Sequence, residues 1–372
     1  MPRKILLFIP GYYGSVLKEK ESGKIRWAKA SNFLFSTQGL GENLPGTKLG
    51  TPKKFIVDGV LKNVTVFPKY WDVDAYKLSI DQLQDFAQKN NMTLEELAYD
   101  WRDDFVGCLK SIDEKIKSFH LTPEDEITVV AHSMGALLTT YYLRYGAQDV
   151  ESAIETWEGA KLITKVALVT PPLHGLMILF RDIEDGTSLG LNRTLLSSLD
   201  YSLFKSSYFF LPPKGEDVGV HVSGEKLTVG IHDLDKWEQN NWGLFKHAKP
   251  SEKKIVREYV GKYLHRSEKF HELLRAPIVD MPVHKMPLLH VRGLGHKTLE
   301  LPVLKPSKER LRYVFDKRSA VDGDGTVTAK SSAALSFFKA FHFTTIDTPH
   351  THLDALVKPE AQEIIQKFIL NP

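Results

Sequence analysis

Apolar runs alternate with amphipathic stretches along most of the chain. Lys4–Ile9, and Ile163–Thr170 apart from Lys165, have the near-continuous hydrophobicity typical of strands buried on both faces of a parallel sheet. Apolar positions at helical spacing predict helices over Tyr76–Ala87 and Phe105–Phe119. Further strands are expected at Val64–Phe67, Leu97–Trp101, Leu288–Val291 and Phe341–Ile346, with a closing helix from Pro359. Such alternation indicates an α/β fold with a doubly wound, mostly parallel sheet.

Two long segments depart from this alternation. From Ser15 to about Val60 the periodicity is poor and glycines are frequent, which favours a lid-like segment over about 15–60. Within it, Phe33-Leu34-Phe35 could contact lipid or join a small apolar cluster. Residues from about 172 to 285 hold aromatic-rich pieces and a charged helical stretch, which indicates an inserted cap. We therefore predict a single domain over 1–372 that carries a lid and a cap.

Composition narrows the class of protein. The chain has 372 residues, 42% of them hydrophobic, and a net charge of +3, which favours no nucleic-acid partner. Its single cysteine, Cys108, excludes an internal disulfide and a cysteine-based metal site, and its spacing places it on the core face of a helix. The first apolar run is too short for a signal peptide, and no run approaches the roughly 18 residues of a spanning helix. These features predict a cytoplasmic protein.

The most informative stretch is Ile127-Thr-Val-Val-Ala-His-Ser-Met-Gly135. A β-branched run stops at Ser133, and a helix-forming run follows at once. This is the context of a nucleophile elbow, G-x-S-x-G with Ala131 in place of the first glycine. The sharp turn needs small residues two positions before and after the serine, and Ala131 and Gly135 meet that need. A surface serine in an ordinary turn is the weaker alternative, so Ser133 is the candidate nucleophile.

A serine nucleophile needs a base and an acid, in the chain order serine, acid, histidine. The turn Asp322-Gly-Asp-Gly-Thr-Val327 follows a late strand and offers two acids, Asp322 and Asp324. It lacks the further oxygen ligands of a calcium loop. A loop after the last strand offers His350 and His352. The residue pattern leaves both choices open.

The turn Pro10-Gly11-Tyr12-Tyr13-Gly14 ends the first strand. In hydrolases of this architecture, a loop after an early strand and the residue after the nucleophile supply the oxyanion-hole N–H groups. Here those residues would be Tyr12 and Met134. An ordinary Pro-Gly turn is the alternative interpretation.

Five stretches together resemble one family. Pro10-Gly11, Tyr99-Asp-Trp-Arg102, Ala131-His-Ser-Met-Gly135, Gly323-Asp-Gly-Thr-Val327 and His352-Leu-Asp354 look like the lecithin:cholesterol acyltransferase family, which includes the lysosomal phospholipase. The resemblance implies an α/β-hydrolase fold and acyl-serine chemistry on lipid esters. It selects Asp324 as the acid and His352 as the base, assigns the oxyanion hole to Tyr12 and Met134, and places a lid tryptophan at Trp27. Secreted members carry a signal peptide and a lid disulfide, and neither is expected for this chain.

These features predict a serine-dependent lipid acyl-ester hydrolase or O-acyltransferase. The catalytic candidates are Ser133, Asp324 and His352, and Trp27, Phe33 and Phe35 are lid or substrate candidates. No metal or other cofactor is expected, and the partners would be an acyl-ester substrate and, transiently, a membrane surface. A hydrolase of small non-lipid esters and a catalytically silent lipid-binding homologue are the alternatives. The choice between water and an alcohol as acyl acceptor stays open.

Overall fold

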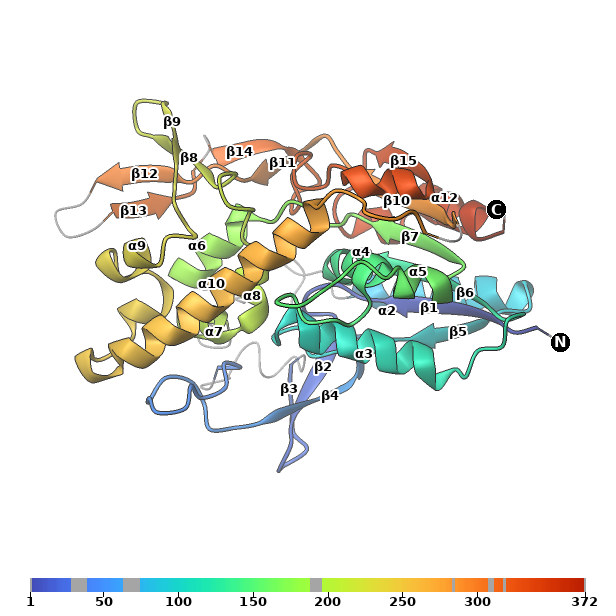
Figure 1. Ribbon diagram of the computed structural model, residues 1–372, viewed down its shortest axis with the longest axis horizontal. Helices are drawn as coiled ribbons and strands as arrows, with labels where there is room; N and C mark the ends of the chain where they lie inside the picture. The colour runs from blue at the N-terminus through green and yellow to red at the C-terminus, as the bar shows by residue number, and fades with distance from the viewer. Residues whose placement is uncertain are drawn as a thin grey trace.

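A six-stranded parallel sheet forms the centre of the molecule (Figure 1). The computed structural model describes residues 2–27, 39–62, 74–187, 196–282, 285–306, 311–316 and 319–370. The strands are, in spatial order, β15 (His342–Thr348), β10 (Pro287–Gly293), β7 (Lys165–Val169), β6 (Glu126–His132), β1 (Lys4–Ile9) and β5 (Thr93–Glu96). Every neighbouring pair is parallel.

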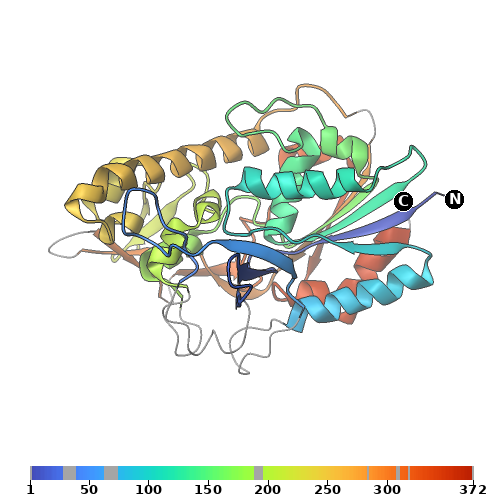
Figure 2. The same cartoon turned by 90° about the horizontal axis from the view of Figure 1, so that it is seen from below.

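Helices cover both faces of this sheet (Figure 2). On one face, α2 (Asp74–Lys89), α11 (Asp354–Val357) and α12 (Pro359–Leu370) share an apolar cluster with the outward side chains of β1, β6 and β10. On the other face, α3 (Phe105–Ser118), α4 (Met134–Tyr145) and α5 (Glu158–Leu162) pack into the larger cluster. Cys108 lies in this second cluster and is buried, as its spacing predicts. Because both faces are covered, β1 and β6 are buried along nearly their whole length.

The predicted strand at Leu97–Trp101 is wrong. The strand in this region is β5, Thr93–Glu96, at the edge of the sheet. An edge strand needs no continuous apolar run, and β5 is mostly half-buried and polar, so its sequence gives a weak strand signal. Leu97, Tyr99 and Trp101 are apolar because they pack into the core beyond the end of that strand. The other predicted strand, Val64–Phe67, lies outside the described residues.

The segment predicted as a lid contains regular structure. Strands β2 (Ser15–Glu19), β3 (Ile25–Trp27) and β4 (Phe55–Val60) form a small antiparallel sheet in the order β3-β2-β4. Irregular pairing, with register shifts in both strand pairs, explains why no simple alternation appears in the sequence. The loop before β4 is tied to the cap, because the backbone N–H of Lys48 donates to Glu252 over 2.7 Å.

The predicted cap at about 172–285 is a layer of helices with a small sheet. Its elements are α6 (Met177–Asp185), α7 (Ser198–Leu203), α8 (Lys205–Phe209), β8 (Val218–His221), β9 (Lys226–Thr228), α9 (Leu234–Gln239), η1 (Gly243–Lys246), η2 (Pro250–Glu252) and α10 (Lys253–Arg275). The small sheet is completed by two strands from outside that range, β12 (Val303–Pro306) and β13 (Leu311–Val314), in the order β13-β12-β8-β9. The cap layer thus includes two strands that follow the predicted range in sequence.

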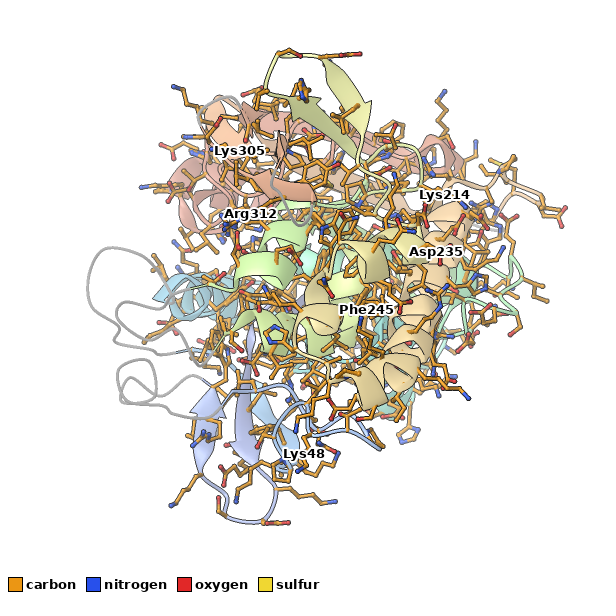
Figure 3. The ribbon with its side chains drawn as sticks, turned by 90° about the vertical axis from the view of Figure 1, so that its left-hand side faces the viewer. Lys48, Lys214, Asp235, Phe245, Lys305 and Arg312 are labelled. Atoms are coloured by element: carbon orange, nitrogen blue, oxygen red, sulfur yellow. The ribbon has the colours of Figure 1, made fainter. Side chains whose placement is uncertain are left out.

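Figure 3 views the cap end of the molecule. Lys305 and Arg312, on β12 and β13, lie above the cap helices, and Lys48 lies below them beside the small antiparallel sheet. The remaining elements are β11 (His296–Leu299), β14 (Ala320–Gly323) and η4 (Ser336–Ala340), of which β11 and β14 form a two-stranded sheet. Among the described residues, no helix combines the length and apolarity needed to cross a bilayer. The central sheet, its two helical layers and the inserted cap make up the predicted α/β-hydrolase fold.

Candidate active site

Ser133 occupies a strained turn between β6 and α4. Its backbone has φ 52° and ψ −119°, a conformation that costs a non-glycine residue about 1–3 kcal/mol. The turn lies directly against the end of β1: a Cβ on Gly135 would stand 2.4 Å from the carbonyl oxygen of Pro10. Only glycine fits there, which is the physical basis of the small-residue requirement in the sequence motif. The serine side chain is thereby held at the carboxyl edge of the sheet.

Asp324 and His352 are joined by side chain and backbone. His352 Nδ1 lies 2.8 Å from Asp324 Oδ2, and the backbone N–H of His352 donates to the Asp324 carbonyl over 2.9 Å. The second carboxylate oxygen accepts the N–H groups of Thr326 and Val327 over 2.8 and 2.6 Å. With the carboxylate accepting from Nδ1, the imidazole proton sits on Nδ1 and Nε2 is left as an acceptor.

Burial alone would raise the pKa of Asp324, but the charge of His352 and these hydrogen bonds outweigh it. The pKa of Asp324 therefore lies below its usual value. The carboxyl group is 1% exposed, so this ionised form persists in a nearly dry setting.

The alternative acid and histidine lie elsewhere in their loops. Asp322 is exposed on β14, and its carboxylate accepts the backbone N–H of Gly295 over 2.8 Å. His350 is half-buried, and the described residues give its side chain no hydrogen bond to either aspartate. The structure thus joins the side chains of Asp324 and His352, and among the described residues neither Asp322 nor His350 has a side-chain hydrogen bond to that pair.

The loop after β1 passes beside the serine. A Cβ on Gly11 would stand 2.8 Å from the Cβ of Ser133, so the backbone approaches the elbow as closely as a glycine allows. In the described part of the chain, no hydrogen bond uses the backbone N–H of Tyr12 or Met134. Two N–H groups next to the serine therefore have no acceptor in that part of the chain.

Ser133 and His352 line one cavity of about 500 Å³. Within the described residues no hydrogen bond joins their side chains. The walls are mostly apolar and aromatic and come from the loop after β1, the ends of β3 and β11, and the cap. They include Tyr12, Tyr13, Trp27, Leu176, Ile178, Leu179, Tyr201, Phe210 and Leu299. Arg181 and Asp182 also line the cavity and form an ion pair of 2.6 Å in its wall. Burial raises the pKa of Asp182.

Residues 16–258 match the lecithin:cholesterol acyltransferase family. The chain belongs to this family. The curated Saccharomyces cerevisiae protein "Uncharacterized protein YJR098C" is 25% identical over 238 residues, which cover 63% of this chain and 33% of the yeast protein. The chain thus spans about a third of the length of that relative.

Two solved structures are similar to this chain, and the first of them shares its fold. The Tle4–Tli4 complex contains a chain with TM-score 0.58 and 11% identity, matched over 100% of this chain and 99% of its own length. The peroxisomal α/β-hydrolase Lpx1 of Saccharomyces cerevisiae has TM-score 0.28 and 14% identity, over 100% of this chain and 79% of its own. The family predicted from the sequence motifs is confirmed by the match over residues 16–258.

The family's lid tryptophan is predicted at Trp27, and the structure places this side chain in the cavity wall. It is 1% exposed and stands 5.0 Å from the ring of Tyr13 and 5.5 Å from that of Trp101. Its indole N–H donates to the Tyr13 carbonyl over 2.9 Å, so it braces the loop after β1. The other two candidates, Phe33 and Phe35, lie outside the described residues.

Sequence reasoning missed two polar side chains beside the serine. Tyr76 is predicted only as a core position of a helix, yet its hydroxyl lies 2.8 Å from the backbone nitrogen of Gly11 and it lines the cavity. His132 precedes the serine and is 1% exposed. Burial, followed by the nearby charge of His352, lowers the pKa of His132 to about 3. The sequence signal for a polar residue beside the serine is a histidine at the end of an otherwise apolar strand.

Proposed function

We propose that this member of the lecithin:cholesterol acyltransferase family is a serine-dependent lipid acyl-ester hydrolase or O-acyltransferase. The family and the α/β-hydrolase fold support an ester-processing enzyme related to lipids. One observation carries the serine mechanism: the strained turn of Ser133 and the hydrogen-bonded pair of Asp324 and His352 meet at the same cavity. A turn with only a structural role would not need this combination, because strained backbone conformations cluster at functional sites.

In the proposed reaction His352 acts as the general base. Its Nε2 accepts the proton of Ser133 Oγ while that oxygen attacks the ester carbonyl carbon. The backbone N–H groups of Tyr12 and Met134 stabilise the resulting oxyanion, and Asp324 stabilises the imidazolium. As the tetrahedral intermediate collapses, His352 returns the proton to the departing alcohol and leaves an acyl-serine. Water or a second alcohol then attacks that ester while His352 accepts its proton. The bond between Ser133 Oγ and the acyl carbon breaks, and His352 returns the proton to Oγ.

The cavity supports a lipid substrate. A volume of about 500 Å³ is within the range of sites for drug-sized ligands, and its aromatic and aliphatic walls fit an acyl chain better than a polar group. Leu176, Ile178 and Leu179 of the cap contribute part of this surface, so the cap would select among acyl chains. The free energy of acyl-chain burial would then contribute to binding at roughly 0.8 kcal/mol per CH₂ group.

A fluorophosphonate probe tests the serine mechanism directly. The wild-type chain should be labelled at Ser133, and Ser133→Ala should not. A panel of phospholipid, diacylglycerol and short acyl esters, each with and without a long-chain alcohol, then identifies donor and acceptor. Turnover of short esters alone would contradict the lipid assignment, and an unlabelled, folded wild-type chain would contradict the serine mechanism.

A further inference from the structure

A buried chain of three hydrogen bonds connects the loops around Ser133. The backbone N of Gly11 lies 2.8 Å from the hydroxyl of Tyr76, and that hydroxyl lies 2.7 Å from Nδ1 of His132. Nε2 of His132 in turn lies 3.1 Å from the carbonyl oxygen of His352. Tyr76 is 7% exposed and His132 1%, so water competes little for these bonds.

All three hydrogen bonds in this series have the same donor-to-acceptor direction. A carbonyl oxygen only accepts, so Nε2 of His132 carries a proton and donates to His352. His132 is neutral near pH 7, because burial lowers its pKa to about 3, and Nδ1 is therefore an acceptor. The hydroxyl of Tyr76 must donate to Nδ1, and its oxygen accepts from the N–H of Gly11. Gly11 therefore donates to Tyr76, Tyr76 donates to His132, and His132 donates to His352.

These bonds join parts of the chain that are remote in sequence. Gly11 follows β1, His132 ends β6, and His352 follows β15, while Tyr76 comes from α2 on the face of the sheet. The partners are separated by 65, 56 and 220 residues. Packing alone would not require a polar link between them, since Tyr76 also sits among apolar residues of α2 and β1 in a common cluster.

We infer that Tyr76 and His132 are positioning residues that hold the oxyanion loop and the histidine loop in place around Ser133. This inference rests on the function proposed above. Tyr76 fixes the N–H of Gly11 and so orients the following residue, Tyr12, whose own N–H is left for the oxyanion. His132 fixes the carbonyl of His352, while Asp324 fixes Nδ1 of the same residue. Backbone and ring of the general base are thus anchored from two sides.

Tyr76→Phe tests this role with little change in packing. Without the hydroxyl, the N–H of Gly11 loses its acceptor and Nδ1 of His132 loses its donor. We expect kcat to fall about 10- to 100-fold, because small misplacements of catalytic groups have effects of that size, with a much smaller change in KM. The rate of fluorophosphonate labelling should fall in parallel.

Tyr208→Phe is the matched control. Tyr208 is fully buried, its hydroxyl donates one hydrogen bond to the carbonyl of Ser202 over 2.9 Å, and it does not line the cavity. It should lose stability as Tyr76→Phe does but keep kcat. Equal kcat in Tyr76→Phe and wild type, or equal losses of kcat in the two variants, would overturn the inference.

A second comparison separates positioning from stability. His132→Leu leaves the hydroxyl of Tyr76 without its acceptor and the carbonyl of His352 without its donor. In the double variant with Tyr76→Phe the bond between the two side chains is lost only once, so the loss of thermal stability should be smaller than the sum of the two single losses. The kcat of the double variant should remain as low as that of the worse single variant. A wild-type kcat in the double variant would show a purely structural role. If wild-type Ser133 is itself unlabelled, the proposed function fails, and the outcome does not depend on Tyr76.

Discussion

The hydroxyl of Tyr99 donates a 2.7 Å hydrogen bond to the backbone carbonyl of Pro10. Pro10 belongs to the loop that passes beside Ser133. The bond therefore gives a structural reason for the motif Tyr99-Asp-Trp-Arg102 and the serine turn to occur in the same sequence. Trp101 bonds the carbonyl of Ser15 over 3.2 Å, and Arg102 bonds that of Leu40 over 2.6 Å. The motif therefore holds the loop after β1 and the segment that follows it, and does not itself reach the reacting atoms.

Tyr99→Phe should weaken both stability and catalysis. The buried carbonyl of Pro10 would lose the Tyr99 donor, which costs about 1–3 kcal/mol of unfolding free energy. Because the same loop carries Tyr12, kcat should fall as well. Urea unfolding and ester turnover measure the two effects. An unchanged kcat in a measurably destabilised variant would mean that the loop keeps its position without this bond.

Substitutions of Ser133 should separate function from stability. Ser133→Ala and Ser133→Gly should each lower turnover by about 10³-fold or more, since both remove the nucleophile. They should differ in stability, because glycine adopts a φ of 52° without strain and alanine does not. We expect the unfolding free energy of Ser133→Gly to exceed that of Ser133→Ala by about 1 kcal/mol. Equal midpoints in urea would show that the turn is less strained than its dihedral angles indicate.

The two aspartates of the Asp322–Val327 turn should respond differently to amide substitution. Asp324→Asn keeps the shape but removes the charge beside His352 and permits the wrong tautomer, so turnover should fall about 10³-fold or more. Asp322→Asn keeps an oxygen for the N–H of Gly295 and should stay within about threefold of wild type. Initial rates on a short acyl ester are sufficient. Similar losses in both variants would contradict the assignment of Asp324.

Much of this arrangement could be predicted from local sequence. The runs Lys4–Ile9 and Ile163–Thr170 become β1 and β7, because strands buried on both faces require continuous hydrophobicity. Ser133 is recognisable because the turn itself demands small neighbours. The edge strand β5 was not recognised, since its half-buried residues carry no such pattern.

Non-local partners explain the rest of what was missed. Pairing of β8 with β12 joins segments about 80 residues apart, and no local pattern specifies it. The bonds of Tyr76 to Gly11 and His132 likewise depend on three remote segments meeting. The choices between Asp322 and Asp324, and between His350 and His352, were open from residue spacing because either member of each pair fits the same loop.

The two histidines should be distinguishable by their pH profiles. His352→Gln should abolish turnover at every pH, because it removes the only ring that contacts Asp324 among the described residues. His350→Gln should keep the rising limb of activity with pH that a general base produces. Both are measured as kcat/KM from pH 5 to 9. A dead His350→Gln with an active His352→Gln would reverse the assignment.

Acid should destabilise the fold through its buried histidines. Burial lowers the pKa of His132 and His271 to about 3 and of His247 and His290 to about 4. Histidine in an unfolded chain titrates near pH 6.5, so below that pH the unfolded state binds more protons than the folded state. Stability is therefore complete above about pH 6.5 and falls as the pH drops toward the folded pKa values. The loss is up to about 1.4 kcal/mol per pH unit for each of the buried residues His132, His271 and His290.

His271 isolates one such contribution away from the serine. It is 2% exposed, and its Nε2 lies 3.0 Å from the carbonyl oxygen of Phe209 in the cap, so it donates that bond while neutral. His271→Gln offers an amide donor that does not titrate. Urea unfolding at pH 7.5, 6 and 5 should give a fixed difference from wild type at pH 7.5 and a progressively smaller loss of stability in the variant below pH 6.5. Parallel stability curves for the two proteins down to pH 5 would mean that His271 becomes protonated in the folded state without cost.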